Sequence, residues 1–121
     1  MTMEEASVKY HIPIQVLKEY RDMGLCDEVK EVMGVWQYDE TDIERLGTIM
    51  TLNDIGFNKD EIQEYMKLLL KNTDTSVQRK MMLRNKRSKT LDEIHFKEIQ
   101  LMKIDYLTNE INQMKKKGEV K

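Results

Sequence analysis

Residues 2–24, TMEEASVKYHIPIQVLKEYRDMG, predict two short helices joined by a tight link. Thr2 with Glu5 three positions later is the capping-box pattern at which helices begin, so we expect the first helix to start here. Pro13 suits the first position of the second helix, where its missing N–H would be unpaired in any case. Gly24 favours the end of that helix, because glycine readily adopts the left-handed conformation found just after a helix. Two helices so closely joined form a helix-turn-helix pattern.

The residues that follow, 25–38, change in character. Their valine, tryptophan and tyrosine side chains favour strands, and Gly34 fits a turn between two of them. We therefore expect a hairpin of two short strands. A helix-turn-helix followed by a hairpin is the layout of a winged DNA-binding domain, in which the second helix enters the major groove and the hairpin contacts the backbone beside it.

Two further helices are expected after the hairpin. Asp39 can cap an amphipathic helix over residues 40–54. Asn58, followed by a glutamate three positions later, repeats the capping-box pattern and opens a helix expected over residues 59–71. We therefore predict a winged helix-turn-helix domain over residues 1–71.

A single long helix is expected after the polar link at residues 72–76, because about forty consecutive residues contain neither glycine nor proline. Apolar residues recur along it at spacings of mostly three, seven or eight positions, namely Leu83, Leu91, Ile94, Leu101, Ile104 and Ile111. Such a stripe needs a covering surface, and a second copy of the chain paired as a coiled coil would supply one. We therefore predict a dimerisation segment over residues 72–121 and a mainly α fold.

Size and composition fit a small helical protein. The chain has 121 residues, of which 35% are charged and 40% hydrophobic. Cys26 is the only cysteine, so an internal disulfide is excluded and a reducing, cytoplasmic setting is expected. No apolar run approaches the roughly 20 residues that a membrane-spanning helix needs, so we predict no membrane association.

Charge is unevenly distributed along the chain. Residues 1–45 hold five Lys or Arg against eleven Asp or Glu, a net charge of −6. Residues 46–70 hold two against four, a net charge of −2, and residues 71–121 hold thirteen against seven, a net charge of +6. The acidic part of the chain is therefore the part in which a DNA-binding domain is predicted.

Signs of an enzyme are lacking. The two histidines, His11 and His95, lie far apart in the sequence, and we expect His95 to have a structural role on the long helix. No glycine-rich phosphate loop, no paired metal ligands and no nucleophile with a partner base is recognisable. Cys26 lies among acidic residues, which disfavour a reactive thiolate. We predict no catalytic residue, no metal site and no cofactor.

Several stretches of the sequence together carry a family resemblance. In order along the chain they are LKEYRDMGL at residues 17–25, GVWQY at 34–38, YDETDIERL at 38–46, IGFNKDEI at 55–62, LDEIH at 91–95 and IDYL at 104–107. These stretches resemble the MerR family of bacterial transcription regulators. The resemblance covers nearly the whole chain and implies a winged helix-turn-helix, two further helices and an antiparallel coiled coil between two subunits. It also implies binding of a homodimer to double-stranded promoter DNA, with RNA polymerase at the promoter as a further partner.

The resemblance places candidate DNA contacts in the second helix and the hairpin. They are Gln15, Lys18, Tyr20, Arg21, Trp36 and Tyr38. Lys18 stands where the family has an arginine, and it keeps the charge but not the planar fork of donors. Trp36 stands where the family has a wing arginine. For Tyr20, Trp36 and Tyr38, ordinary core packing is the alternative interpretation.

Two functions stay open from the sequence. The first is a homodimeric transcription regulator that binds promoter DNA. The second is a MerR-like protein with weakened DNA binding that acts as a protein-interaction antagonist or adaptor. The second is motivated by the net charge of −6 over residues 1–45, because phosphate contacts supply most of the affinity for DNA.

Overall fold

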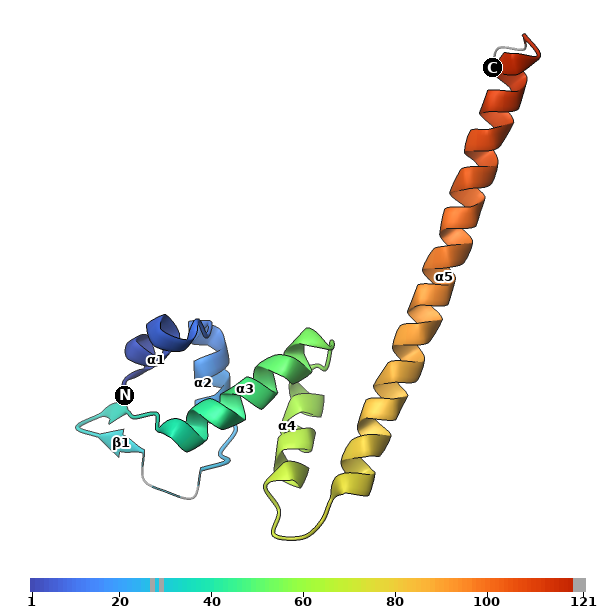
Figure 1. Ribbon diagram of the computed structural model, residues 1–121. Helices are drawn as coiled ribbons and strands as arrows, with labels where there is room; N and C mark the ends of the chain where they lie inside the picture. Colours follow the sequence, from blue (N-terminus) through green and yellow to red (C-terminus); the bar gives the residue numbers. More distant parts are fainter. Residues whose placement is uncertain (27, 29, 119–121) are drawn as a thin grey trace. The chain divides into compact units, whose positions relative to one another are not determined.

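The computed structural model of the protein describes residues 1–26, 28 and 30–118 (Figure 1). Along the chain the elements are α1 (Met3–Tyr10), α2 (Ile14–Asp22), β1 (Glu31–Val32), β2 (Val35–Trp36), α3 (Glu40–Asp54), α4 (Lys59–Leu69) and α5 (Ser76–Lys116). The chain divides into two compact units, Met1–Lys80 and Met81–Lys121. We call the first unit the head. The mainly α fold predicted from the sequence is confirmed.

Helices α1 and α2 form the expected helix-turn-helix. The Thr2 hydroxyl accepts a hydrogen bond from the Glu5 N–H at 3.2 Å, and the Glu5 carboxylate accepts one from the Thr2 N–H at 3.3 Å, so the predicted capping box is present. Pro13 differs from the prediction, because it caps α2 instead of occupying its first position. Its extended backbone lets its carbonyl accept from the Val16 and Leu17 N–H groups while the residue itself stays outside the helix. Gly24 has a φ of +67°, as expected after a helix.

The predicted hairpin is present and short. Strands β1 and β2 are antiparallel, with Val32 paired to Val35 across a two-residue turn. Both turn residues have positive φ, 53° at Met33 and 79° at Gly34, which is the signature of a type I′ turn. This turn has the twist that tight hairpins prefer, and we call the hairpin the wing. Val29, one of the strand-favouring residues, lies outside the described residues.

The third helix begins and ends where the sequence predicts, over Glu40–Asp54, with Asp39 as its cap. Asn58 caps α4 as predicted, through a capping box with Glu61. Helix α4 stops at Leu69, two residues before the expected end at 71. The Thr75 hydroxyl donates to the Leu68 carbonyl at 2.6 Å, and that carbonyl is an acceptor that a further helical turn would have used.

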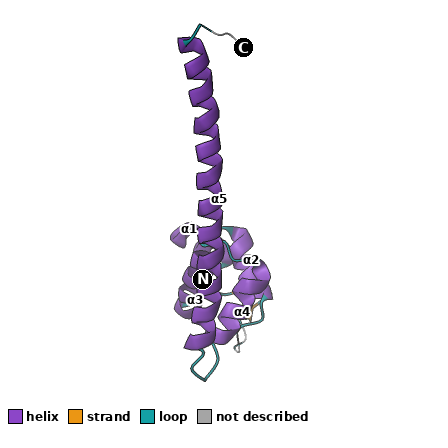
Figure 2. Cartoon of the chain, turned by 90° about the vertical axis from the view of Figure 1, so that its right-hand side faces the viewer, coloured by secondary structure: helices purple, strands orange, loops and turns teal. Residues whose placement is uncertain are grey.

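The core lies within the head. Its fully buried large side chains are Leu17, Tyr20, Tyr38, Asp42, Leu46 and Met66. Helix α5 runs unbroken from Ser76 to Lys116 (Figure 2) and holds no buried residue. The head therefore has a core of its own, whereas the apolar side chains of α5 are not covered by the single chain.

Candidate nucleic-acid interface

The outward face of α2 carries two of the predicted DNA contacts. Gln15 and Lys18 are exposed, whereas Leu17 and Tyr20 on the same helix are buried. This difference follows from the helical period, which places residues three or four apart on one face. The Gln15 amide donates to the Glu19 carboxylate at 3.4 Å, a weak exposed contact that a DNA base edge could replace.

Arg21 is half-buried near the end of α2. Its Nε donates to the Asp22 carboxylate at 3.1 Å. The exposed fractions of the two side chains are 37% and 64%, and such surface pairs contribute little to stability. A phosphate group could therefore compete with Asp22 for the guanidinium.

Tyr20 lies in the core, with an exposed fraction of 1%. Its hydroxyl donates to the Asp42 carboxylate at 2.5 Å, and burial, followed by this hydrogen bond, raises the pKa of Tyr20 above its ordinary value. Because the hydroxyl is already bonded inside the head, this geometry favours the packing interpretation of Tyr20 over that of a phosphate donor.

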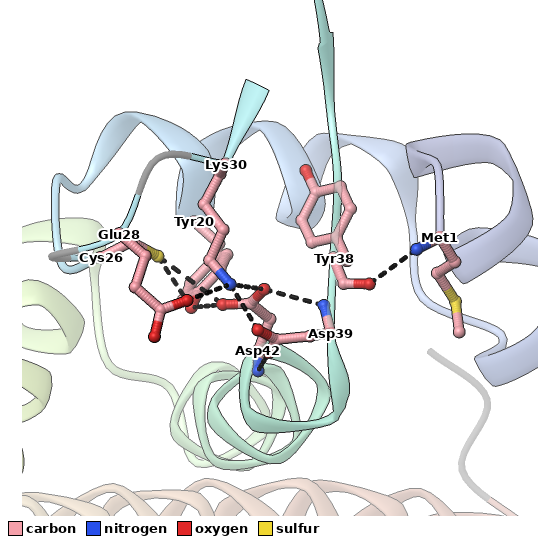
Figure 3. Close-up of polar contacts among 8 residues, drawn as sticks. All are labelled: Met1, Tyr20, Cys26, Glu28, Lys30, Tyr38, Asp39 and Asp42. Carbon is pink, nitrogen blue, oxygen red and sulfur yellow. Dashed lines mark hydrogen bonds and ion pairs between the residues drawn. The ribbon is translucent and has the colours of Figure 1, made fainter. Parts of the chain in front are cut away.

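Asp42 joins three parts of the head (Figure 3). Its carboxylate is 1% exposed and accepts the Tyr20 hydroxyl from α2. It also accepts the Lys30 ammonium at 3.1 Å from the base of the wing, and the Asp39 N–H at 2.9 Å at the start of α3. A buried carboxylate without such partners would be costly, so the four residues form an interdependent cluster. We call Tyr20, Lys30, Asp39 and Asp42 the wing-base cluster.

Lys30 is bound within this cluster. Its ammonium lies 2.5 Å from the Asp39 carboxylate and 3.7 Å from Glu28, and its side chain is 9% exposed. The hydrogen bond from Lys30 is the main cause that lowers the pKa of Asp39 to about 2, and Asp39 in turn raises the pKa of Lys30. In the sequence Lys30 appears only as one more positive charge. The spacing of Asp39 and Asp42 is a capping-box pattern, and it was the one sequence signal that these two carboxylates lie together.

Tyr38 and Trp36 support the wing from inside. The Tyr38 hydroxyl donates to the Leu17 carbonyl of α2 at 3.0 Å, and the Tyr38 N–H donates to the Met1 carbonyl at 2.7 Å. Burial raises the pKa of Tyr38 to about 12. The Trp36 ring packs 6.4 Å from the Tyr38 ring, and its buried Nε1 has no hydrogen-bond partner among the described residues. These two side chains therefore fix the wing against α2.

The outer part of the wing is apolar. Met33 at the turn is 98% exposed, and Val32 and Val35 are 58% and 46% exposed. The described strands and turn, residues 31–36, carry one charge, that of Glu31. This part of the wing therefore has no cation of its own that would attract a DNA phosphate.

The residues predicted to form the dimer interface are exposed on α5. Their exposed fractions run from 37% to 59%, and they are Leu83, Leu91, Ile94, Leu101, Ile104 and Ile111. An isolated soluble chain rarely exposes so many large apolar side chains along one helix. Their assignment to an interface stays a prediction.

Cys26 lies beside the wing-base cluster, 3.3 Å from the Tyr20 hydroxyl and 3.6 Å from the Asp42 carboxylate. Burial raises the pKa of the Cys26 thiol, which disfavours the thiolate. Among the described residues, no group of three or more His, Cys, Asp or Glu side chains is arranged to hold a metal ion. In the same part of the chain, no helix is long and apolar enough to cross a membrane.

The model of the MerR HTH family of regulatory proteins matches residues 1–69, which include α1 to α4 and the wing. The chain belongs to this family. The match confirms the resemblance seen in the sequence. The family is one of regulatory proteins, and its model includes every described element up to α4. No protein of curated function matches the chain.

Solved structures of MerR-family proteins share the fold. A protein from Listeria monocytogenes, described as a candidate MerR family transcriptional regulator, is 18% identical with a TM-score of 0.68, over 93% of this chain and 86% of that one. HiNmlR, a MerR family regulator lacking the sensor domain and bound to promoter DNA, is 19% identical with a TM-score of 0.64, over 98% and 94%. A MerR family regulator from Bacillus thuringiensis is 19% identical with a TM-score of 0.60, over 91% and 97%.

Proposed function

We propose that this MerR-family chain is a transcription regulator that binds promoter DNA as a homodimer, with α2 in the major groove and the wing beside it. The observation that carries the proposal is the family match over residues 1–69, which include α1 to α4 and the wing, together with a recognition helix whose Gln15 and Lys18 point outward from a buried face. The similarity to a relative bound to promoter DNA supports it. The function implies RNA polymerase at the promoter as a further partner, and a cytoplasmic location.

The homodimer is supported by the order of apolar residues on α5. Read from either end the stripe is nearly the same, because Leu91 and Ile94 mirror Ile104 and Leu101, and Leu83 mirrors Ile111. Two identical helices that run in opposite directions can therefore match their apolar side chains along most of their length. This near symmetry favours antiparallel pairing of two copies.

The direct test is recovery of sheared genomic DNA on the purified protein at low salt, followed by sequencing of the bound fragments. We expect enrichment of a two-fold symmetric element, because a symmetric dimer contacts two half-sites. Lys18→Ala should weaken binding to that element by about tenfold or more, since a base contact is worth roughly 1–3 kcal/mol. Lys71→Ala, an exposed lysine just after α4, is the matched control. A folded, dimeric protein that enriches no element would contradict the proposal.

The antagonist or adaptor function is the second candidate. It is favoured by the engagement of Lys30 within the wing-base cluster and by the apolar, cation-free wing. The two functions differ in their response to salt, because a DNA-binding protein loses affinity steeply as salt rises. A protein partner held along an apolar surface would stay bound in the same titration.

A further inference from the structure

The first turns of α5 carry the densest positive charge of the chain. Within residues 79–89, which we call the basic segment, six of eleven side chains are cationic, namely Arg79, Lys80, Arg84, Lys86, Arg87 and Lys89. Between Asp74 and Asp92 there is no acidic residue. Like charges three or four positions apart on a helix repel one another, so this arrangement is costly without an anionic partner.

These cations are not neutralised within the single chain. Lys80, Arg84, Arg87 and Lys89 are exposed, and Arg79 and Lys86 are half-buried. The Arg79 Nε donates to the Thr75 hydroxyl at 3.1 Å, and a hydroxyl group carries no charge to neutralise the guanidinium. Among the described residues, none of the six cations lies within 4.0 Å of a carboxylate, whereas Lys30 in the head contacts three.

A polyanion matches the dimensions of the basic segment. Eleven helical residues extend over about 16 Å, and duplex DNA carries roughly nine phosphate charges in that length. The cations are spread around much of the helix circumference, so several of them remain on any side of the helix that faces a DNA backbone. Phosphate also suits both the arginine and the lysine side chains.

The head needs cations from elsewhere to hold DNA tightly. Residues 1–45 have a net charge of −6, and the described strands and turn of the wing contain no cation. The acidic head of a second copy is a weaker candidate occupant for the basic segment. Several of its carboxylates are already bonded internally, among them Asp39 and Asp42 to Lys30, and Glu5 and Glu61 in capping boxes.

We propose that the basic segment binds the phosphate backbone of double-stranded DNA, as a contact separate from α2 and the wing and independent of base sequence. The proposal rests on the proposed function in that DNA is its ligand. In the proposed antiparallel dimer, the Lys115–Lys117 run of the other copy would lie at the same end of the coiled coil as the basic segment and add to its positive charge.

The test uses the full chain and a duplex of random sequence about 40 base pairs long, titrated between roughly 50 and 200 mM salt. The neutralised variant is R84Q/K86Q/K89Q, which keeps good helix-forming residues. We expect its slope of log affinity against log salt to be shallower by about two to three units, since each lost phosphate contact removes about 0.9. Its affinity at roughly 100 mM salt should fall at least tenfold.

Two controls separate position from charge. R84K/K86R/K89R keeps every charge and should keep the slope of the parent protein. Lys103→Gln removes one lysine that lies two heptads after Lys89, at the same heptad position and likewise exposed. Lys89→Gln should lower the slope by about one unit, whereas Lys103→Gln should change it by less than half a unit.

Three outcomes would overturn the proposal. Equal slopes for the parent and the neutralised variant would remove the basic segment from DNA, even if the genomic experiment still recovers a symmetric element. Equal effects of Lys89→Gln and Lys103→Gln would show a response to net charge alone. A neutralised variant that binds DNA normally but dissociates to monomers in sedimentation would assign the segment to the acidic surface of a second copy.

Discussion

At the scale of single residues, Asp42 determines how the wing and the recognition helix are held together. Its carboxylate receives a hydroxyl from α2, an ammonium from the wing base and an N–H from the start of α3. Removing one of these donors would leave the buried Asp42 carboxylate incompletely paired. The effects of substitutions in this cluster should therefore not be additive.

Tyr20→Phe removes one of these donors while keeping the packed ring. We expect the free energy of unfolding to fall by about 2 kcal/mol, because the lost hydrogen bond is made to a charged group. The measurement is urea unfolding followed by circular dichroism. Tyr10→Phe, at a more exposed ring, should change stability by less than about 0.5 kcal/mol. A loss of DNA affinity in folded Tyr20→Phe without a loss of stability would instead make the hydroxyl a DNA contact.

The ion pair between Lys30 and Asp39 predicts how stability depends on acid. The pKa of Asp39 is lowered to about 2 from an ordinary value of 3.8. Its contribution to stability is therefore complete above the unfolded pKa and is lost as pH falls from about 4 to about 2. Asp39→Asn should flatten this part of the stability profile, measured as thermal midpoint against pH.

Lys30→Met is the complementary variant, because it removes the main cause of the lowered pKa of Asp39. Its stability profile should therefore be flatter between about pH 4 and pH 2, as in Asp39→Asn, because the pKa of Asp39 then differs less between the folded and unfolded chains. Profiles of the same steepness in the parent and in Asp39→Asn would show that this pair does not govern acid stability.

At the scale of elements, the wing depends on a turn with an unusual residue. Met33 has a φ of 53°, a conformation that asparagine tolerates well and β-branched residues do not. Met33→Asn should raise the free energy of unfolding by about 0.5 kcal/mol, and Met33→Val should lower it by about 1 kcal/mol. The side chain is 98% exposed, so packing should not obscure the comparison. Equal stabilities would show that the turn conformation is not strained by methionine.

The secondary-structure elements show which contacts could be predicted from the sequence and which could not. The caps at Thr2, Asp39 and Asn58 were predictable, because a capping box is a contact between residues three positions apart. The bond from Tyr20 to Asp42 was not predictable from periodicity, because it joins residues from two helices that only the tertiary fold brings together. For the same reason the charge count over residues 1–45 could not show that Lys30 is paired inside the head.

At the scale of the whole molecule, the proposed pairing of two α5 helices should be weakened by a single substitution in the apolar stripe. Leu101→Lys should raise the dissociation constant of the dimer about a hundredfold, because each copy loses a buried leucine worth roughly 1.5 kcal/mol or more and gains a charge in the seam. Sedimentation velocity over a range of concentrations measures this change. Gln100→Lys, the same new side chain on the neighbouring residue, should leave the dimer intact. An unchanged dimer in Leu101→Lys would place the interface elsewhere.

The unbroken run of α5 from Ser76 to Lys116 also affects how long a chain survives. None of its residues is buried by its own chain, and many of them are lysine or arginine. A newly made chain without a partner therefore offers proteases a long helix that opens easily, whereas pairing would protect it. Under this arrangement scarce copies are degraded faster than abundant ones, so the amount of the protein would follow its rate of synthesis more steeply than in simple proportion.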